Sequence, residues 1–278
     1  MLLNAMPRGS RLAVWGDPIA HSKSPALHAA AYRALNLDWE YGRRQVDAAR
    51  FTDALQSLDR SWRGLSLTMP LKEAAFRAAS VHDRHAAMTG AVNTLLLGDE
   101  PRGYNTDVGG IVDALAENGV RDVGTVRLLG GGATAASALV AASDLGARRA
   151  DVRARRPERA RPVVELGAEL GVHVDVHPFD AAAAPVDLTV ATLPSGTVLD
   201  PTISAPLAEH GGVLFDAAYA PWPSALAASW SGAPTISGLG MLLHQAVRQI
   251  RIFRDGDPSQ PLDDEDAVIA AMRAALDA

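Results

Sequence analysis

The chain has 278 residues, of which 48% are hydrophobic and 21% are charged, with a formal net charge of −6. This length accommodates two domains with cores of their own, and the negative charge argues against nucleic acid or an anionic membrane as the main partner. The sequence has no cysteine and no ligand spacing among its eight histidines, which excludes disulfides and thiolate chemistry and leads us to expect no metal site.

Strand-like and helix-like segments alternate in the first half of the chain. The predicted strands are 11–16, 39–46, 64–69 and 91–98, and the predicted helices are 25–36, 48–58, 71–80 and 107–118. Strands that alternate with helices in this way predict parallel βαβ units.

A second α/β series follows from residue 125. Its predicted strands are 125–130, 150–156, 172–177, 186–193 and 211–219, and its predicted helices are 131–146, 238–253 and 264–278. We expect the last two helices to return to the first domain. The sequence therefore predicts two α/β lobes with a cleft between them, a common place for a cofactor and a substrate to meet.

The sequence indicates neither a signal peptide at residues 1–11 nor a transmembrane helix. Residues 1–11 contain too short an apolar core for a signal peptide, and no apolar run approaches the roughly 20 residues of a transmembrane helix. We therefore expect a cytoplasmic protein.

A glycine-rich turn follows the strand predicted at 125–130. Gly130, Gly132 and Ala135 form a G-x-G-x-x-A pattern in the stretch LLGGGATAA. The first glycine permits a tight turn, the second lets backbone approach a pyrophosphate, and the alanine allows close helix–strand packing. Between a strand and a helix this pattern predicts a dinucleotide site, although an alanine-rich helix after a glycine turn gives the same letters.

The residues that choose between NAD and NADP follow the next strand. Asp151 lies about 20 residues after the glycines, where a ribose-binding acid would indicate NAD. It falls near the start of that strand, however, whereas ligands bind beyond the carboxyl ends of parallel strands. Arg155, Arg156 and Arg159 come at that end, and guanidinium groups suit the 2′-phosphate of NADP by charge and forked geometry. We predict NADP, with a solvated basic loop as the alternative.

Lys72 and Asp107 stand at the beginnings of two predicted helices. A cation in the first turn of a helix is electrostatically disfavoured, so a nearby carboxylate is expected to offset the penalty. Such a lysine can give or accept a proton, and Asp107 is a candidate for the carboxylate. The alternatives are an exposed lysine followed by a favourable Glu73, and an aspartate that only caps its helix.

Two serines precede the helix predicted at 25–36, in the stretch GDPIAHSKSPALH. Ser24 is followed by Pro25 and is predicted to be the N-cap. Ser22 is not needed for capping. Two hydroxyls and free backbone N–H groups at a helix N-terminus make a cradle for a carboxylate.

In their joint order, seven stretches of the chain resemble shikimate dehydrogenases: GDPIAHSKSP, GLSLTMPLK, GAVNTL, NTD, GGGATAA, FDAAY and SGLGMLLHQ. The resemblance runs from Val14 to the terminal helices. It implies an α/β substrate-binding and catalytic domain at 1–105 and 239–278, and a Rossmann-like NADP-binding domain with a parallel sheet at 106–238. It also implies an oxidoreductase of chorismate and aromatic amino-acid biosynthesis, which interconverts 3-dehydroshikimate and shikimate with NADP(H).

The resemblance further implies roles for individual residues. Lys72 and Asp107 would be the catalytic pair, with Lys72 handing a proton to the alkoxide that forms when the ketone is reduced. The implied substrate-binding residues are Ser22, Ser24 and Tyr219 at the carboxylate, and Ser66, Thr68, Asn93 and Gln245 at the ring hydroxyls. The implied cofactor-binding residues are Gly130, Gly131, Gly132, Ala133, Thr134, Ala135, Arg155, Arg156, Arg159, Thr192, Ala217 and Gly238.

Several of these residues have a structural alternative. Asn93 could be a turn residue, Tyr219 a core aromatic with its hydroxyl outward, and Gln245 a solvent-facing position of an amphipathic helix. The chain also departs from the family at two places. Ser66 stands where family members commonly have Asn, so a contact to a ring hydroxyl is lost or bridged by water. Ala154 stands where the family usually has Asn before its arginine.

Two other functions fit the same residues. One is an NAD-linked quinate/shikimate or aminoshikimate dehydrogenase, and the other is a non-catalytic NADP-binding regulatory protein. The presence of both Lys72 and Asp107 favours an enzyme, because binding alone does not need that pair. The expected partner is a small molecule rather than nucleic acid or membrane, and a homodimer is compatible with the resemblance.

Overall fold

The computed structural model describes residues 9–277, so the first eight residues of the stretch considered as a signal peptide, and Ala278, lie outside it. The chain divides into two compact units. Unit 1 takes the chain up to Thr106 and again from Gln245, and unit 2 runs from Asp107 to His244. No helix within residues 9–277 is long and apolar enough to cross a membrane.

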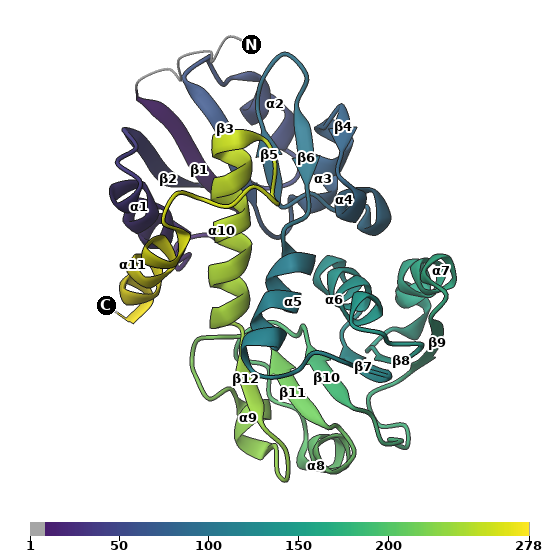
Figure 1. Cartoon of the computed structure of the whole chain (residues 1–278). Coiled ribbons are helices and arrows are strands. Elements are labelled where there is room, and N and C mark those ends of the chain that lie inside the picture. The colour runs from purple at the N-terminus through teal and green to yellow at the C-terminus, as the bar shows by residue number, and fades with distance from the viewer. Residues whose placement is uncertain (1–8, 278) are drawn as a thin grey trace. The chain divides into compact units, whose positions relative to one another are not determined.

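Unit 1 is built on a six-stranded sheet in the order β2-β1-β3-β5-β6-β4 (Figure 1). Its strands are β1 (Ser10–Gly16), β2 (Trp39–Gln45), β3 (Trp62–Leu67), β4 (Val81–His82), β5 (Thr94–Leu96) and β6 (Arg102–Tyr104). β1 pairs in parallel with β2 and β3, as the alternating pattern predicts. The prediction of parallel pairing is wrong for β5, which runs antiparallel to both β3 and β6. Only residues 97–101 join β5 to β6, and so short a connection can join only antiparallel neighbours.

Six helices contribute to unit 1: α1 (Ser24–Ala34), α2 (Phe51–Gln56), α3 (Lys72–Ala78), α4 (Arg84–Thr89), the later part of α10 (Leu239–Asp255) and α11 (Glu265–Asp277). The helical periodicity predicts all of them except α4. That short helix depends on its ends, because Asp83 accepts a hydrogen bond from the Ala86 N–H and Gly90 closes it in the left-handed conformation.

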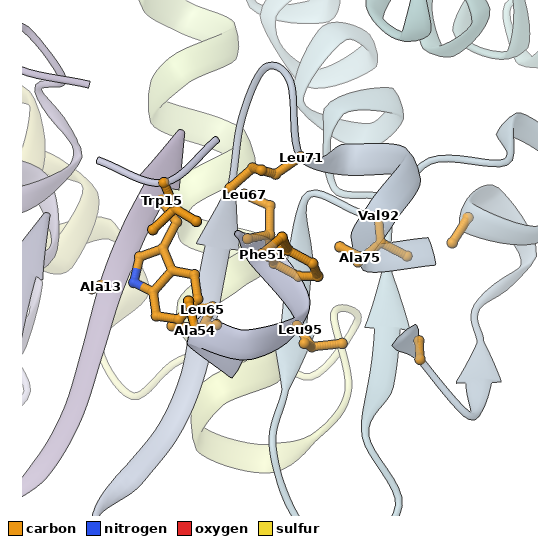
Figure 2. Close-up of a cluster of buried hydrophobic side chains, with 13 residues drawn as sticks. Ala13, Trp15, Phe51, Ala54, Leu65, Leu67, Leu71, Ala75, Val92 and Leu95 are labelled. Atoms are coloured by element: carbon orange, nitrogen blue, oxygen red, sulfur yellow. The ribbon is translucent and has the colours of Figure 1, made fainter. Parts of the chain in front are cut away.

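A buried apolar cluster fixes β1 and β3 beneath α2 and α3. Figure 2 shows Trp15, Phe51, Leu65 and Leu67 in this cluster. The Trp15 ring meets the Phe51 ring edge-on, with centroids 6.2 Å apart and planes at 81°. The loops that leave these two strands therefore start from a rigid edge.

A second buried cluster lies under α1. His28 stacks on Tyr41 with ring centroids 3.8 Å apart, and its Nδ1 lies 3.0 Å from the carbonyl oxygen of Ser24. A carbonyl only accepts, so Nδ1 carries the proton and donates. Burial lowers the pKa of His28 from 6.5 to about 4. The imidazole is therefore neutral at physiological pH.

This histidine makes stability depend on pH. Unfolded chains take up a proton on His28 as the pH falls through 6.5, whereas the folded protein resists protonation down to a pH of about 4. The free energy of unfolding should therefore fall by about 3 kcal/mol across that window. His28→Phe keeps an aromatic ring on Tyr41 and should flatten the dependence. Urea unfolding of both proteins above pH 6.5 and near pH 4 measures this change in the free energy of unfolding. An equal change in the unaltered protein and in His28→Phe would show that His28 is not its source.

Unit 2 is built on a second six-stranded sheet, in the order β12-β11-β10-β7-β8-β9. Its strands are β7 (Thr125–Leu129), β8 (Arg149–Arg153), β9 (His173–His177), β10 (Leu188–Ala191), β11 (Val213–Asp216) and β12 (Thr235–Ser237). All five pairings are parallel. Counted within unit 2 this is the order 3-2-1-4-5-6 of the Rossmann fold, whose switch point lies between β7 and β10.

The helices of unit 2 are α5 (Asp107–Glu117), α6 (Ala133–Asp144), α7 (Arg161–Leu170), α8 (Pro201–Glu209), α9 (Ala225–Ser229) and the first turns of α10, with a 3₁₀ turn at Pro157–Ala160. The start of α10 packs on α5. A Cβ placed on Gly240 would lie 3.1 Å from the Cβ of Ala114, and His244 Nε2 lies 3.3 Å from a carboxylate oxygen of Glu117. The division between the units consequently falls inside α10.

Candidate active site

The topology of unit 1 gathers the predicted substrate residues at one edge of its sheet. β1 and β3 are parallel, so the loops with Ser22 and Thr68 leave from the same edge. β5 is antiparallel to β3, so its beginning, with Asn93, lies at that edge too. β6 is antiparallel to β5 and ends there, shortly before Asp107. The antiparallel direction of β5, which the pattern did not predict, is therefore what brings Asn93 to the edge.

Backbone hydrogen bonds hold this edge together. Thr68 N–H donates to the carbonyl of Trp15 at 2.9 Å, and Leu67 N–H donates to the carbonyl of Asn93 at 2.7 Å. Val92 N–H donates to the carbonyl of Lys72 at 3.0 Å, so the first residue of α3 is fixed directly beside the beginning of β5. Thr68, Lys72 and Asn93 thus share one framework.

Helix α1 starts differently from the prediction. Its N-cap is Lys23, whose φ of −84° and ψ of −7° are already helical, and whose carbonyl accepts from Ala26 and Leu27 at 3.1 and 3.2 Å. The prediction that Ser24 caps the helix is therefore wrong, because the helical turn begins one residue earlier. The Ser22 hydroxyl accepts the N–H of Ser24 at 3.3 Å, so Ser22, not Ser24, supports the helix start. Since Ser22 acts there as an acceptor, its O–H can still donate to an anion.

Lys72 is the half-buried first residue of α3, as predicted. The chain has only two lysines, Lys23 and Lys72, among 26 lysines and arginines. Asp107 is the first residue of α5 and is buried, with 5% of its surface exposed. It directly follows Thr106, whose N–H donates to the Asn93 side chain at 2.9 Å. In a chain that uses arginine almost throughout, a lysine at this edge is a chemically distinct group.

Ser66 is buried within a hydrogen-bonded network. It accepts from the Tyr41 hydroxyl at 2.6 Å and donates to Gln249 Oε1 at 2.8 Å. Because its one proton is donated to Gln249, Ser66 cannot donate to a ring hydroxyl in this arrangement. Burial raises the pKa of Tyr41 well above its usual value, which keeps the phenol protonated as a donor.

The other predicted substrate residues are divided between the units. Gln245 is buried in α10 and belongs to unit 1. Tyr219 is half-buried in unit 2, and burial raises the pKa of its phenol. The solvent-facing alternative for Gln245 is excluded by its burial.

Unit 2 contains a pocket at the switch point of its sheet. It has a volume of about 310 Å³ and is lined by Gly130, Gly131, Gly132, Ala154, Arg155, Arg156, Arg159, Ala160, Phe179, Thr192, Leu193 and Pro194. The glycine turn, the three predicted arginines and Thr192 therefore meet at one place. The sequence reasoning missed Phe179, which follows β9, the neighbour of β8; the rule that parallel strands end at the same edge could have found it.

The glycine turn fits the phosphate-bearing end of a dinucleotide. Gly130 has a φ of +120°, and a Cβ there would lie 2.4 Å from the Thr192 hydroxyl oxygen, so no other residue fits. A Cβ on Gly132 would meet no protein atom within 4 Å, which leaves room for a ligand. Helix α6 begins at Ala133 with Thr134 in its first turn, where backbone N–H groups and the helix dipole favour phosphate. Ala135 is fully buried.

Asp151 has a structural task. Its carboxylate accepts from Arg127 Nε and Arg153 Nε, both at 2.8 Å, and lies 3.1 Å from His177 Nδ1. Burial opposes its ionisation, but the hydrogen bonds from Arg153, Arg127 and His177 prevail and hold the pKa of Asp151 below its usual value. A carboxylate committed to two buried arginines does not serve a ribose, in keeping with its position at the start of the strand.

Ala217 and Gly238 lie against each other in unit 2. A Cβ on Gly238 would lie 2.2 Å from the carbonyl oxygen of Ala217, so the approach requires glycine. The residues predicted near the nicotinamide are thus neighbours, whereas neither lines the pocket that holds the arginines.

Comparison with known proteins gives a consistent result. Residues 14–95 match the model of the shikimate dehydrogenase substrate binding domain. A shikimate dehydrogenase (NADP(+)) from Methanothermobacter thermautotrophicus is 34% identical over 262 residues, which is 90% of this chain and 92% of the relative.

Solved structures agree. The shikimate dehydrogenase of Mycobacterium tuberculosis is 39% identical, with a TM-score of 0.83 over 95% of this chain and 99% of that one. The shikimate 5-dehydrogenase of Thermus thermophilus, in complex with NADP(H) and shikimate, is 31% identical, with a TM-score of 0.79 over 96% and 99% of the two chains. Relatives this similar over nearly their full length show that the chain belongs to the shikimate dehydrogenase family.

Proposed function

We propose that the chain catalyses the NADPH-dependent reduction of 3-dehydroshikimate to shikimate, in chorismate and aromatic amino-acid biosynthesis. The observation that carries the proposal is the meeting of Arg155, Arg156 and Arg159 with the glycine turn in one pocket of a Rossmann sheet, in a member of this family. The arginines supply charge for the 2′-phosphate that distinguishes NADP from NAD.

The two units have different tasks in this proposal. Unit 2 holds the coenzyme through the glycine turn, the first turn of α6, the three arginines and Thr192, with Ala217 and Gly238 toward the nicotinamide. Unit 1 holds the substrate, with Ser22 and Ser24 at the carboxylate, assisted by Tyr219 from unit 2. Thr68, Asn93 and Gln245 hold the ring hydroxyls.

Lys72 and Asp107 form the catalytic pair. NADPH, when bound, supplies the hydride that reduces the ketone. Lys72 stabilises the negative charge that develops on the ketone oxygen and gives it a proton from Nζ. Asp107 accepts a hydrogen bond from a substrate hydroxyl and balances the charge of the lysine.

Because Ser22 and not Ser24 supports the start of α1, the two serines should differ in their effect on stability. Ser24→Ala removes a carboxylate contact but no helix cap, so it should raise KM for shikimate while the free energy of unfolding hardly changes. Ser22→Ala should also raise KM and, by removing the acceptor for the Ser24 N–H, cost roughly 0.5–1 kcal/mol of stability. Steady-state kinetics and urea unfolding of both variants measure this, and an unchanged KM in both would assign the serines to turn structure.

The assembly and location are also proposals. We expect a homodimer, which light scattering on the purified protein measures, and we place the enzyme in the cytoplasm, where a reaction that consumes NADPH has its reductant.

A matrix of two substrates and two coenzymes tests the function. The purified chain should oxidise shikimate with NADP⁺ far faster than with NAD⁺, and should turn over quinate poorly with either. Fast quinate oxidation with NAD⁺ would instead identify a quinate/shikimate dehydrogenase.

A further inference from the structure

A chain of buried side chains links three of the segments at the substrate edge of unit 1. Gln249 lies in α10 and is 2% exposed. Its Oε1 accepts from Ser66, and its Nε2 donates to the Asn93 carbonyl at 3.2 Å and to Thr94 Oγ1 at 3.0 Å. Thr94 Oγ1 in turn donates to the Asn93 side-chain oxygen at 2.8 Å. One glutamine thus connects β3, β5 and the side chain of Asn93.

Two backbone groups fix the direction of every bond in this chain. The carbonyl of Asn93 can only accept, so the group that faces it must be the N–H₂ of Gln249, and its Oε1 must face Ser66. Ser66 therefore has to donate to Gln249, and Tyr41 has to donate to Ser66. Thr94 accepts from Gln249 and must donate onward to Asn93.

The second backbone group orients Asn93 itself. The N–H of Thr106 can only donate, and it meets Asn93 Oδ1 at 2.9 Å. The Asn93 amide nitrogen then faces the Thr106 hydroxyl, also at 2.9 Å. Rotation of the amide by a half-turn would place its N–H₂ group, a donor, against two further donors, the Thr94 O–H and the Thr106 N–H. The Thr106 N–H thus fixes which way the Asn93 amide faces, and the Thr94 O–H, whose direction Gln249 sets, holds the amide in that orientation from the other side.

We propose that Gln249 is a positioning residue that, together with the Thr106 N–H, holds the Asn93 amide in its orientation, and through it supports the recognition of a substrate ring hydroxyl. The Tyr41–Ser66 pair locks Gln249 from the other side, so Ser66 is part of this support instead of the direct contact expected from an asparagine at its position. The identity of the substrate in this proposal rests on the proposed function. The role of Gln249 in holding Asn93 rests only on the hydrogen-bonded network.

The kinetic test compares shikimate with analogues that lack one ring hydroxyl, at C4 or at C5. In the unaltered enzyme, loss of the hydroxyl that Asn93 contacts should lower kcat/KM about tenfold, the usual worth of a buried hydrogen bond left unmade. In Gln249→Leu the KM for shikimate should rise about tenfold. The kcat/KM of this variant for the same analogue should then be less than about twofold below its kcat/KM for shikimate. Thr94→Val, which keeps the shape but breaks the link to Asn93, should behave alike.

Tyr104→Phe is the matched control. It removes a partly buried hydrogen bond of unit 1, from the Tyr104 hydroxyl to the Gly256 carbonyl at 2.9 Å, and leaves the side chains of the network unchanged. A general loss of stability would lower discrimination against the analogue in Tyr104→Phe as well. If the network is responsible, this discrimination should fall only in Gln249→Leu and Thr94→Val. Unchanged discrimination in those two would overturn the proposal.

A second measurement needs no substrate. The chain has five asparagines, so a sample labelled with ¹⁵N in asparagine gives a sparse side-chain amide spectrum. The Asn93 amide should exchange its hydrogens slowly in the unaltered protein and at least about tenfold faster in Gln249→Leu, since buried, satisfied amides exchange only through opening. If the chain proves inactive on shikimate, the proposed function fails and this exchange alone decides; equal exchange rates would overturn the positioning role.

Discussion

Replacement of Lys72 by alanine should lower kcat by about 10²–10⁴-fold, the usual range for the loss of a general acid. Reduction of a ketone develops negative charge on oxygen, and a cationic donor at that oxygen stabilises the transition state more than the ground state. The KM for substrate should therefore change far less than kcat. Stopped-flow and steady-state assays on the variant measure both quantities.

Lys72→Arg separates charge from proton donation. A guanidinium keeps the positive charge but does not give up its proton near neutral pH, so kcat should remain low while KM stays close to normal. Arg77→Ala, which removes an exposed cation from the last turn of the same helix, is the control and should be fully active. A folded Lys72→Ala protein with near-normal kcat would remove Lys72 from the mechanism and favour a binding role for the chain.

The second large effect concerns the coenzyme. A hydrogen bond from a charged group contributes roughly 1.5–3 kcal/mol, and Arg155 and Arg156 are exposed, so screening by solvent places them at the lower end. At about 1.4 kcal/mol for each factor of ten, the double change to alanine should lower the preference for NADP over NAD about 100-fold. The reaction with NAD should hardly change, because NAD lacks the 2′-phosphate.

Arg161→Ala is the matched control for the arginines. Arg161 lies in the same basic stretch, but it pairs with Glu165 at 2.7 Å on the surface and does not line the pocket. It should keep the full preference for NADP. Equal use of both coenzymes by the unaltered protein, or an unaltered preference in the double variant, would contradict the role of the pocket.

The sequence predicted the parts of the fold that depend on local pattern. Hydrophobic periodicity located β7, α6 and β8, and the glycine turn between them, because each is a regular element with a strong period or a required glycine. It could not predict that β5 runs antiparallel, since strand direction is set by which neighbour the chain reaches, not by its own residues. It also missed α7 and α8. Pro206 lies inside α8 and interrupts its helical signal, whereas Pro162 stands in the first turn of α7, where proline is tolerated.

In the candidate site too, local motifs could be predicted, whereas contacts between distant residues could not. Motif order led to the prediction of Lys72, Asn93 and Asp107, and the ends of the strands led to the prediction of the arginines. Gln249 was not predicted, because its partners Ser66 and Asn93 are 183 and 156 residues away in sequence and meet it only in the folded unit. The cap of α1 was predicted wrongly since Ser-Lys-Ser-Pro allows the helix to begin at either side of Lys23, and local preference alone does not choose between them.

A single-turnover experiment tests the proposed activity most directly. Purified protein in excess over NADPH is mixed with 3-dehydroshikimate, and the loss of nicotinamide absorbance is followed together with the formation of shikimate. We expect complete, stoichiometric conversion by the unaltered protein and severely slowed conversion by Lys72→Ala with NADPH still bound. Binding of NADPH without any conversion by the unaltered protein would show that this chain is a shikimate dehydrogenase in family but not in activity.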